Sequence, residues 1–250
     1  MPGLRGQHAL VTGGGRGIGR AVAASLTGAG AAVTVLGRSE APLRDAVAAR
    51  DADAYIVADV TDERAVAAAI GDAGQIDILV ANAGSAESAP FARTTAQQFQ
   101  RLFDVNVMGA VHAVHAVLGA MTARGTGRIV VIASTAGLKG YAYVSAYCAA
   151  KHAVVGLVRA LALETAKTGV TVNAVCPGYT DTELLRQSIA QTVARTGWRE
   201  ESILAEMLKY QPLGRLIEPA EVAAAVLYLC SPGASAVNGT TLAVAGGEIG

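Results

Sequence analysis

A glycine-rich loop near the N-terminus constrains the fold more than any other feature of this sequence. The apolar segment His8–Thr12 predicts a short strand, the loop Gly13–Gly19 follows at once, and the alanine-rich segment Arg20–Thr27 predicts a helix. Glycines let the backbone approach a pyrophosphate closely, and a helix N-terminus offers free N–H groups and positive dipole charge. We therefore expect a phosphate cradle, whereas the alternative is a flexible loop that uses glycine only for its turns.

Strands and helices alternate along the rest of the chain. Six further apolar segments predict strands: Ala32–Leu36, Tyr55–Ala58, Ile76–Val80, Arg128–Ile132, Val170–Val175 and Gly239–Val244. Helices are expected over Thr95–Arg124, Ala146–Glu164 and Pro219–Cys230. Such alternation is typical of a parallel sheet with helices on both faces. Because we see no linker or internal repeat, the sequence predicts one α/β domain over residues 1–250, a Rossmann-like doubly wound sheet of about seven strands.

Charge and cysteine content narrow the classes of function. The chain has 20 basic and 20 acidic residues without a basic block, so neither a nucleic-acid partner nor an anionic membrane surface is suggested. The N-terminus lacks a signal-peptide pattern, and no apolar stretch approaches the roughly 20 residues of a membrane span. The three well-separated cysteines fit free thiols in a reducing cytoplasm. Cys148 and His152 share a helix face, but two ligands are too few, so we expect no metal site.

A serine, a tyrosine and a lysine follow the strand that ends at Ile132. Ser134 lies just past that strand, and Tyr147 and Lys151 are four positions apart, which places them on one face of a helix. A tyrosine titrates near pH ~10, and a nearby ammonium lowers that pKa. The tyrosine can then exchange a proton with an alcohol or carbonyl oxygen that the serine holds, while a cofactor must carry the hydride. The alternative is an accidental spacing.

The residues after the next two strands discriminate between cofactors. An acidic side chain after the second strand would bind the ribose 2′-hydroxyl of NAD, but the chain has Gly37 and Arg38 there. Arg16 in the glycine loop can add a second positive group, so NADP(H) is favoured and NAD(H) is the alternative. Asp59, after the third strand, either accepts from the adenine amino group or caps the following helix.

The predicted helix over Thr95–Arg124 contains an asparagine and two histidines. Asn106 lies among apolar residues of a helix and needs a buried polar partner, so a satisfied structural amide is one reading. His112 and His115 on the same helix are interpreted as packing or subunit-contact residues.

The segment 183–210 breaks the alternation of strands and helices. It contains two weakly amphipathic helical pieces around Thr196–Trp198, and we expect it to be a lid that covers the substrate.

Over nearly its whole length the chain resembles the short-chain dehydrogenase/reductase family. The matching motifs are Thr12-Gly13-x-x-x-Gly17-x-Gly19, Asn82-Ala83-Gly84, Asn106, Ser134 thirteen residues before Tyr147, Tyr147-x-x-x-Lys151, and Pro177-Gly178 with Thr182. Two positions depart from the family pattern: Ala81 replaces an asparagine, and Ala245 replaces an aspartate often found before the C-terminal Gly-Gly.

The resemblance implies a role for each matching residue. Tyr147 would be the general acid/base, Lys151 would lower its pKa and bind the nicotinamide ribose, Ser134 would orient the substrate oxygen, and Asn106 would hold a water linking Lys151 to solvent. The implied cofactor contacts are Gly13, Arg16, Gly17, Ile18, Gly19, Arg38, Asp59, Val60, Asn82, Ala83, Gly84, Tyr147, Lys151, Pro177, Gly178, Thr180 and Thr182. The family usually assembles as a homotetramer through the helices around Asn106 and Tyr147.

Within the family, the sequence is similar to 3-oxoacyl-thioester reductases and to the ketoreductases of aromatic polyketide synthesis. Reduction of a 3-oxoacyl thioester is therefore the first hypothesis, and a basic docking patch for its carrier would comprise Lys139, Arg186, Arg195 and Arg199, although nearby acids balance them. The second hypothesis is the same chemistry on a free ketone or secondary alcohol, such as an aryl ketone, a steroid or a cyclic diol. The third is a non-catalytic dinucleotide-binding sensor, against which the intact Ser134, Tyr147 and Lys151 argue.

Overall fold

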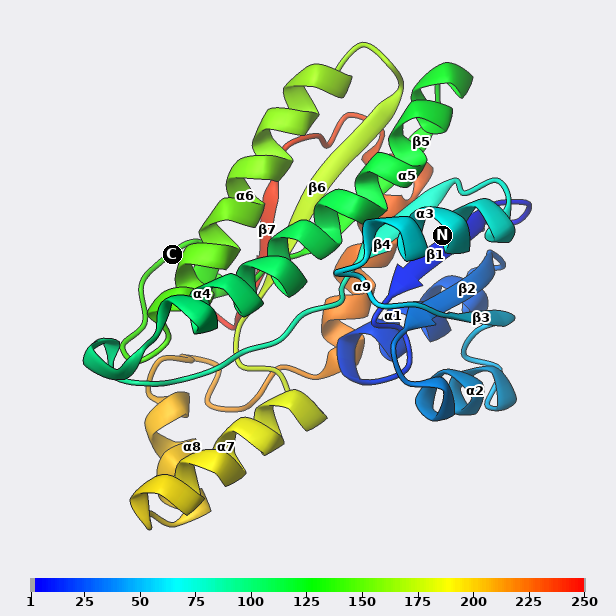
Figure 1. The fold of residues 1–250 in the computed structure, drawn as a ribbon. Coiled ribbons are helices and arrows are strands. Elements are labelled where there is room, and N and C mark those ends of the chain that lie inside the picture. Colours follow the sequence, from blue (N-terminus) through cyan, green and yellow to red (C-terminus); the bar gives the residue numbers. More distant parts are fainter. Residues whose placement is uncertain (1–2, 250) are drawn as a thin grey trace.

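Seven parallel strands form one sheet in the computed structural model of the chain, which describes residues 3–249 (Figure 1). The spatial order is β3-β2-β1-β4-β5-β6-β7. The strands are β1 (His8–Thr12), β2 (Ala32–Gly37), β3 (Ala54–Val57), β4 (Ile78–Ala81), β5 (Gly127–Ile132), β6 (Val170–Pro177) and β7 (Thr241–Val244). The predicted seven-stranded Rossmann-like sheet is thereby confirmed, and residues 1, 2 and 250 of the predicted domain lie outside the described residues.

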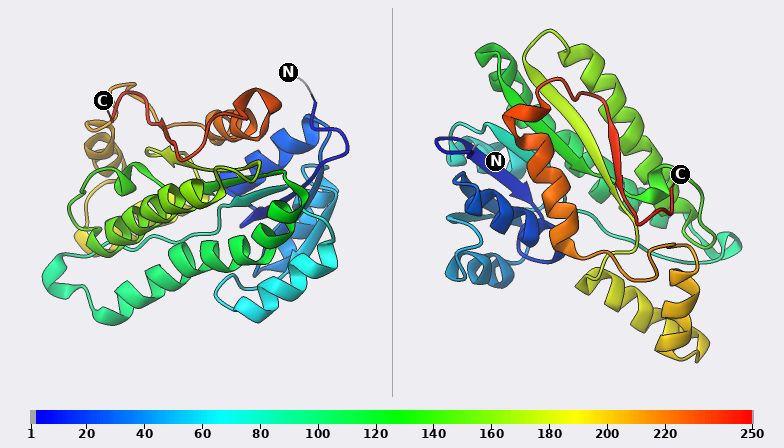
Figure 2. Two further views of the ribbon diagram at one scale, coloured as in Figure 1. Left: turned by 90° about the horizontal axis from the view of Figure 1, so that it is seen from above. Right: turned by 180° about the vertical axis from the view of Figure 1, so that it is seen from behind.

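Helices cover both faces of the sheet because successive side chains of each strand point to opposite sides. Leu10 and Leu36 enter one hydrophobic core, whereas their neighbours Val11 and Val35 enter the other. The first core is covered by α3 (Glu63–Ala73), α5 (Gly109–Arg124) and α6 (Ser145–Thr165). The second is covered by α1 (Gly17–Gly28), α2 (Glu40–Ala48) and α9 (Pro219–Cys230). Figure 2 shows the two helical layers with the sheet between them.

The strand order brings several strand ends together beside β1. β1 pairs with β2 on one side and with β4 on the other, so the chain reverses its direction of travel across the sheet beside β1. In open parallel sheets, ligands bind outside the carboxyl ends of the strands where this reversal occurs. The loops after β1, β4, β5 and β6 therefore meet at one edge, and these loops carry most of the predicted site residues.

The predicted helical segment Thr95–Arg124 consists of three parts. It starts as α4 (Ala96–Phe103), passes through a π-helical turn over Asp104–Met108, and continues as α5. A π-helical turn inserts a residue into a helix and is frequent at functional sites. The turn contains Asn106, which is 3% exposed.

The segment 183–210 forms two helices at the carboxyl edge of the sheet. They are α7 (Glu183–Thr196) and α8 (Glu200–Leu208), and both project away from the body of the sheet (Figure 1). Gly197 ends α7 in the left-handed conformation with φ 69°. Ile189 is the buried residue of α7 and Ile203 that of α8, and neither belongs to the two hydrophobic cores beside the sheet.

Two helical stretches are long and apolar enough to span a membrane by length and composition. They are residues 96–124 and α6, and this corrects the expectation that no apolar stretch approaches that length. Val114 and Val117 on the first stretch and Val154 and Val158 on α6 are buried in the core beside the sheet. The apolar composition of both stretches is accounted for by this packing, because the core helices of a sheet protein pass the same test.

Candidate active site

The glycine loop after β1 is fixed by Asn82, which follows β4. The Asn82 side-chain amide donates to the carbonyl oxygens of Thr12 at 3.0 Å and Gly13 at 3.2 Å. The backbone N–H groups of Asn82 and Ala83 both donate to the Thr12 hydroxyl oxygen, at 3.0 and 3.1 Å. A Cβ atom on Gly19 would lie 2.2 Å from the Gly13 carbonyl oxygen and 2.4 Å from the Asn82 amide nitrogen. The loop therefore has its shape only with glycine at this position.

The start of α1 has the features of a cradle for a dinucleotide pyrophosphate. Arg16 is the N-cap residue, yet its side chain makes no capping hydrogen bond, so the first N–H groups of α1 are not capped by that side chain. Gly17 has φ 50°, and a Cβ there would lie 3.3 Å from the Thr182 methyl carbon. Ile18 packs against the core beneath the loop. N–H groups that the Arg16 side chain leaves uncapped, a close glycine backbone and a positive helix end fit a phosphate group.

Arg38 and Asp59 lie at the ends of adjacent strands. Arg38 Nη1 lies 3.8 Å from Asp59 Oδ2, and both side chains are substantially exposed, at 66% and 40%. Asp59 Oδ1 accepts from the N–H and the hydroxyl of Thr61, both at 2.9 Å. The alternative reading of Asp59 as a helix cap is wrong, because Asp62 caps α3 by accepting from the N–H groups of residues 64 and 65.

The next residue, Val60, is contacted by two residues of α5. His112 Nδ1 lies 2.9 Å from the Val60 carbonyl oxygen, and Val60 is 5% exposed. A Cβ on Gly109 would lie 2.8 Å from a Val60 methyl carbon. His112 thus contacts the backbone after β3, and the choice between packing and subunit contact for His112 and His115 stays a prediction.

Arg16 is paired with a residue that the sequence did not indicate. Its Nη1 lies 3.2 Å from Glu183 Oε2 in the first turn of α7. Because Thr182 also contacts the glycine loop at Gly17, the start of α7 lies directly against the predicted cofactor loop. Neither guanidinium proposed for phosphate binding is buried, since Arg16 is 56% and Arg38 66% exposed.

The structure brings Ser134, Tyr147 and Lys151 together at the carboxyl end of β5. Lys151 is 4% exposed, and its ammonium donates to the Ile132 carbonyl oxygen at 2.9 Å and lies 5.7 Å from the centre of the Tyr147 ring. Ser134 follows the strand, and its hydroxyl oxygen accepts from the Ala136 N–H at 3.1 Å.

The loop that carries Ser134 is pressed against α6. A Cβ on Gly137 would lie 2.7 Å from the Lys151 carbonyl oxygen, so only a glycine lets the backbone approach this closely. The separation between the loop and the tyrosine helix is thereby fixed by backbone contact.

Burial dominates the protonation of the tyrosine and lysine. Burial raises the pKa of Tyr147 to about 12, and the hydrogen bond with the Ser134 hydroxyl acts in the opposite direction. Burial lowers the pKa of Lys151 to about 8, an effect that Cys176 opposes. The pKa of Tyr147 thus lies above its usual value because desolvation of the phenol dominates, and the lowering contribution expected of the Lys151 ammonium stays a prediction. At neutral pH Tyr147 is a protonated phenol that has a proton to donate.

Asn106 is engaged with backbone groups on two sides. Its side-chain amide donates to the carbonyl oxygens of Leu102 and Ser85, both at 2.9 Å, and its Oδ1 accepts from the Ser85 N–H at 3.3 Å. A Cβ on Gly84 would lie 2.8 Å from Asn106 Oδ1 and 3.7 Å from the Lys151 ammonium. These contacts support the reading as a satisfied structural amide, and the water-holding role implied by the resemblance stays a prediction.

The turn after β6 closes the set of predicted cofactor residues. The Gly178 N–H donates to the Val244 carbonyl oxygen at 3.0 Å, immediately after Pro177. The Thr180 hydroxyl donates to the Gly178 carbonyl oxygen at 3.0 Å, and Thr182 caps α7 by accepting from the residue 185 N–H. Through Thr182 this turn reaches the glycine loop, so the predicted cofactor residues from both halves of the chain meet.

Each of the four cations of the predicted docking patch has its own hydrogen-bond or ion-pair partner. Arg186 lies 3.0 Å from Asp181, Arg199 lies 3.3 Å from Glu201, and Lys139 lies 3.3 Å from Glu248. Arg195 donates to the Ser88 carbonyl oxygen at 2.6 Å and to its hydroxyl at 3.0 Å. The expectation that nearby acids balance this patch is confirmed for three of its four members.

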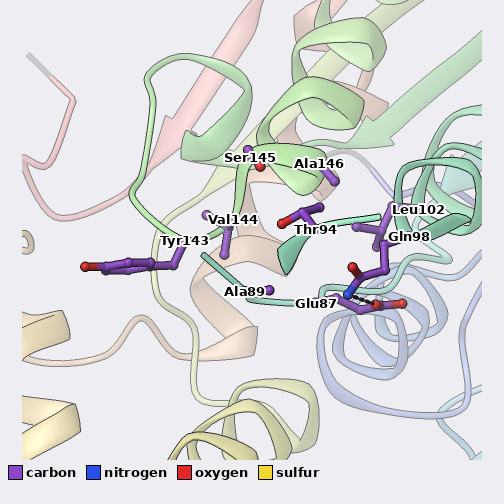
Figure 3. A pocket seen from close by; sticks show the side chains of 9 residues that line it. All are labelled: Glu87, Ala89, Thr94, Gln98, Leu102, Tyr143, Val144, Ser145 and Ala146. Atoms are coloured by element: carbon purple, nitrogen blue, oxygen red, sulfur yellow. Dashed lines mark hydrogen bonds between the residues drawn. The ribbon is translucent and has the colours of Figure 1, made fainter. Parts of the chain in front are cut away.

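A small cavity lies where α6 begins (Figure 3). Its volume is about 10 Å³, which suffices for one water molecule and not for a substrate. The Ala89 N–H donates to the Tyr143 carbonyl oxygen at 2.8 Å across it, and Gln98 donates to Glu87 at 3.2 Å. Tyr143 has φ 68°, is 67% exposed and points away from the cavity in Figure 3.

Sequence reasoning missed a group of side chains on the loops after β5 and β6. Tyr141 and Tyr210 lie close to Lys139, Tyr179 meets the Tyr141 ring edge-on, and Glu248 joins them from the C-terminal tail. The concentration of tyrosines after the predicted fifth and sixth strands was an available signal, since the chain has seven tyrosines in all. Glu248 gave no such signal, because it lies 107 or more residues from its partners.

Comparisons with known proteins agree with this geometry. A family model described as short chain dehydrogenase matches residues 7–193. The chain is 40% identical to a cis-4-hydroxycyclohexanecarboxylate dehydrogenase of Sinomonas cyclohexanicum, covering 96% of this chain and 95% of that protein. It is 38% identical to an acetoacetyl-CoA reductase of Rhizobium meliloti, covering 96% and 97%. A solved actinorhodin polyketide ketoreductase variant with NADPH superposes with a TM-score of 0.90 at 38% identity over 97% of both chains.

Proposed function

Because the chain belongs to the short-chain dehydrogenase family, we propose that it reduces a 3-oxoacyl thioester to the 3-hydroxyacyl thioester with NADPH. The relatives support the general activity without the specific substrate: the chain is an NAD(P)-dependent oxidoreductase that interconverts a ketone and a secondary alcohol. The observation that carries the proposal is the convergence of Ser134, Tyr147 and Lys151 at the carboxyl end of β5.

Each of the three side chains has a defined task in this reaction. When bound, a reduced nicotinamide would supply the hydride that none of these side chains can provide. The Ser134 hydroxyl donates a hydrogen bond to the carbonyl oxygen and holds it beside Tyr147. Tyr147, protonated at neutral pH, gives its proton to that oxygen as the negative charge develops. The Lys151 ammonium lies 5.7 Å from the Tyr147 ring and stabilises the phenolate that remains.

The cofactor preference rests on charge at the end of β2. This strand ends in Gly37 without an acidic side chain, and Arg38 follows. Arg38 and Arg16 both have exposed guanidinium groups that can turn toward a 2′-phosphate. The actinorhodin relative was solved with NADPH, which supports NADP(H) over the alternative NAD(H).

The substrate choice rests on the relatives and on the helical pair α7–α8. A relative named acetoacetyl-CoA reductase favours a thioester, and we propose that the segment 183–210 covers it as a lid. The dehydrogenase that is 40% identical is named for a cyclic secondary alcohol, and this supports free ketones as the second candidate. The engaged cations of the predicted docking patch also weaken the case for a carrier-bound substrate.

We further propose a homotetramer in the cytoplasm. Leu163 on α6 is 81% exposed and Met108 beside α5 is 40% exposed, so the outer surfaces of these helices present apolar side chains that a second copy would cover. The three cysteines are buried free thiols, which fits a reducing compartment. Size-exclusion chromatography with light scattering tests the assembly.

The decisive experiment follows the loss of reduced-nicotinamide absorbance with NADPH and NADH in parallel. Acetoacetyl-CoA is compared with a panel of aryl, steroid and cyclic ketones at equal concentrations. We expect NADPH oxidation with acetoacetyl-CoA to have the highest kcat/KM. Turnover only with free ketones would overturn the thioester assignment, and turnover only with NADH would overturn the cofactor assignment, while the oxidoreductase activity would stand in both cases.

A further inference from the structure

A carboxylate from the C-terminal tail is buried beside the candidate active site. The Glu248 side chain is 0% exposed. The Lys139 ammonium lies 3.3 Å from its Oε1 and donates to its backbone carbonyl oxygen at 3.4 Å. The Tyr141 hydroxyl donates to the same Oε1. A buried carboxylate is stable only with such partners, so this arrangement specifies one position for the tail.

The carboxylate is connected to the loop that carries Ser134. The Tyr141 hydroxyl lies 2.7 Å from the Thr135 hydroxyl oxygen, and Thr135 directly follows Ser134 and is 3% exposed. Burial and the adjoining Glu248 carboxylate raise the pKa of Tyr141, so this phenol stays protonated and keeps donating. A hydrogen-bonded path therefore runs from the tail through Tyr141 to the residue beside the substrate-orienting serine.

The second oxygen of the same carboxylate faces the turn after β6. Glu248 Oε2 is buried and has no hydrogen-bond partner within residues 3–249. A Cβ on Gly178 would lie 2.8 Å from this oxygen and 3.3 Å from Ala245. Glu248 thus fills the space beneath Gly178, which belongs to a turn of implied cofactor contacts.

Aromatic rings extend the cluster to the helical pair. The Tyr141 ring meets Tyr179 edge-on at 6.2 Å and Tyr210, just past the end of α8, at 6.5 Å between ring centres. The Lys139 ammonium lies 5.0 Å from the Tyr141 ring centre and 5.8 Å from that of Tyr210. Cation–π and edge-on contacts of this kind are attractive. Four separate segments of the chain therefore meet at Glu248 and its partners.

We propose that Glu248 is a positioning residue that holds the Ser134 loop and the Gly178 turn in register for reduction. The inference rests on the proposed function for the reaction that it affects. What Glu248 itself determines is the order of the Ser134 loop and the Gly178 turn. Without the carboxylate, the Tyr141 hydroxyl loses an acceptor and Lys139 loses its partner, so the segment 138–144 between Ser134 and Tyr147 is released. A displacement of about 1 Å between reacting groups reduces turnover by up to roughly a hundredfold.

The test uses variants of the full chain. Glu248→Ala removes both contacts, whereas Glu248→Gln keeps an acceptor for Tyr141. We expect Glu248→Ala to lower kcat about tenfold, with NADPH affinity by fluorescence titration changed less than about twofold, and Glu248→Gln to recover at least half of kcat. The matched control is Asp77→Ala, which removes a mostly buried carboxylate that pairs with Arg124 before the amino end of β4, and it should leave kcat unchanged.

Hydrogen–deuterium exchange supplies a readout independent of substrate. In Glu248→Ala, amide exchange should accelerate in segments 133–144 and 178–182 while the strands of the sheet stay protected. Tyr141→Phe should produce the same pattern in 133–144, and the double variant should be no worse than Glu248→Ala, because both act through one contact.

Two results would overturn the proposal. One is wild-type kcat with unchanged exchange in Glu248→Ala, and the other is faster exchange throughout the chain, which would indicate general destabilisation. If the wild-type protein does not reduce acetoacetyl-CoA, the proposed function fails, yet the exchange experiment still decides the role of Glu248.

Discussion

The two walls of the candidate site are built in different ways. The wall formed by the loops after β1, β4 and β5 is fixed by backbone contacts that tolerate no side chain, as at Gly19 and Gly137. The wall formed by α7 and α8 contributes Ile189 and Ile203 as buried residues and is held by exposed pairs such as Arg195 with Ser88. Backbone contacts admit one geometry, whereas exposed side-chain pairs exchange readily with water.

Under the proposed function, this difference separates chemistry from substrate recognition. A proton donor and a hydride site need a geometry fixed to a fraction of an ångström, which the first wall supplies. A cover over a substrate must open and adapt, and elements with few buried contacts open most easily. Substitutions in the first wall should therefore change kcat or abolish cofactor binding, whereas substitutions in α7–α8 should change KM by small factors.

The largest effect is expected at Tyr147. Tyr147→Phe removes the proton donor but keeps the ring, so turnover should fall by about 10²–10⁴ while NADPH binding changes less than about twofold. Steady-state kinetics and fluorescence titration measure the two quantities separately. A residual kcat above about a tenth of the wild-type value would contradict the proton-donor role.

The glycine loop provides the next test of the rigid wall. Gly19→Ala places a methyl group 2.2 Å from a carbonyl oxygen, and forcing such a contact costs about 1–3 kcal/mol or more. We expect a lower Tm and NADPH binding weakened more than about tenfold. Gly28→Ala, at the other end of the same helix, has no atom within 4 Å of the new Cβ and is the matched control. Equal NADPH affinity in both variants would show that the loop is adaptable after all.

Most of the rigid wall could be predicted from the sequence because its signals are local. The strand that leads to Gly13 occurs at the predicted residues, and the fifth strand, with Ser134 just beyond it, begins one residue earlier than predicted. A parallel sheet then brings these strand ends to one edge, so Ser134 and Tyr147 converge without further information.

The remaining contacts could not be predicted because they join distant segments. Arg16 with Glu183 and Tyr141 with Glu248 depend on how α7 and the tail return to the sheet, and no local pattern encodes that return. The burial of Tyr147 could not be predicted for a similar reason, since helical spacing shows a lysine one turn away but not the desolvation that raises the pKa of the phenol.

A change of intermediate size is expected in the cofactor preference of Arg38→Asp. Arg38→Asp replaces a partner of the 2′-phosphate with a repelling charge, and hydrogen bonds to charged groups contribute about 1.5–3 kcal/mol. The ratio of kcat/KM for NADPH over NADH should therefore fall by about tenfold to a hundredfold. Parallel assays with both cofactors measure it. An unchanged ratio would show that Arg38 does not read the phosphate, and Arg16→Ala would then be examined.

The pH dependence of kcat/KM should follow the protonation of Lys151. Its pKa is lowered to about 8 by burial, so the ammonium is complete below that value and is lost as pH rises through it. Tyr147, with a pKa raised to about 12, stays protonated over the same range. The reductive kcat/KM should be flat below pH 8 and then fall about tenfold per pH unit. Lys151→Arg keeps its charge at all these pH values and should abolish the break, whereas a wild-type profile flat to pH 10 would contradict the assignment.

The smallest effect is expected in α7. Arg195 donates two hydrogen bonds to Ser88 and so connects α7 to the loop after β4, but the contact is exposed. Exposed pairs of this kind contribute little, so Arg195→Ala should raise the substrate KM by no more than about fivefold and leave kcat unchanged. Arg199→Ala, which removes a contact with its near neighbour Glu201, should change neither quantity. A fall in kcat above about tenfold in Arg195→Ala would mean that α7 also fixes the reacting groups, and the two walls would then share one function.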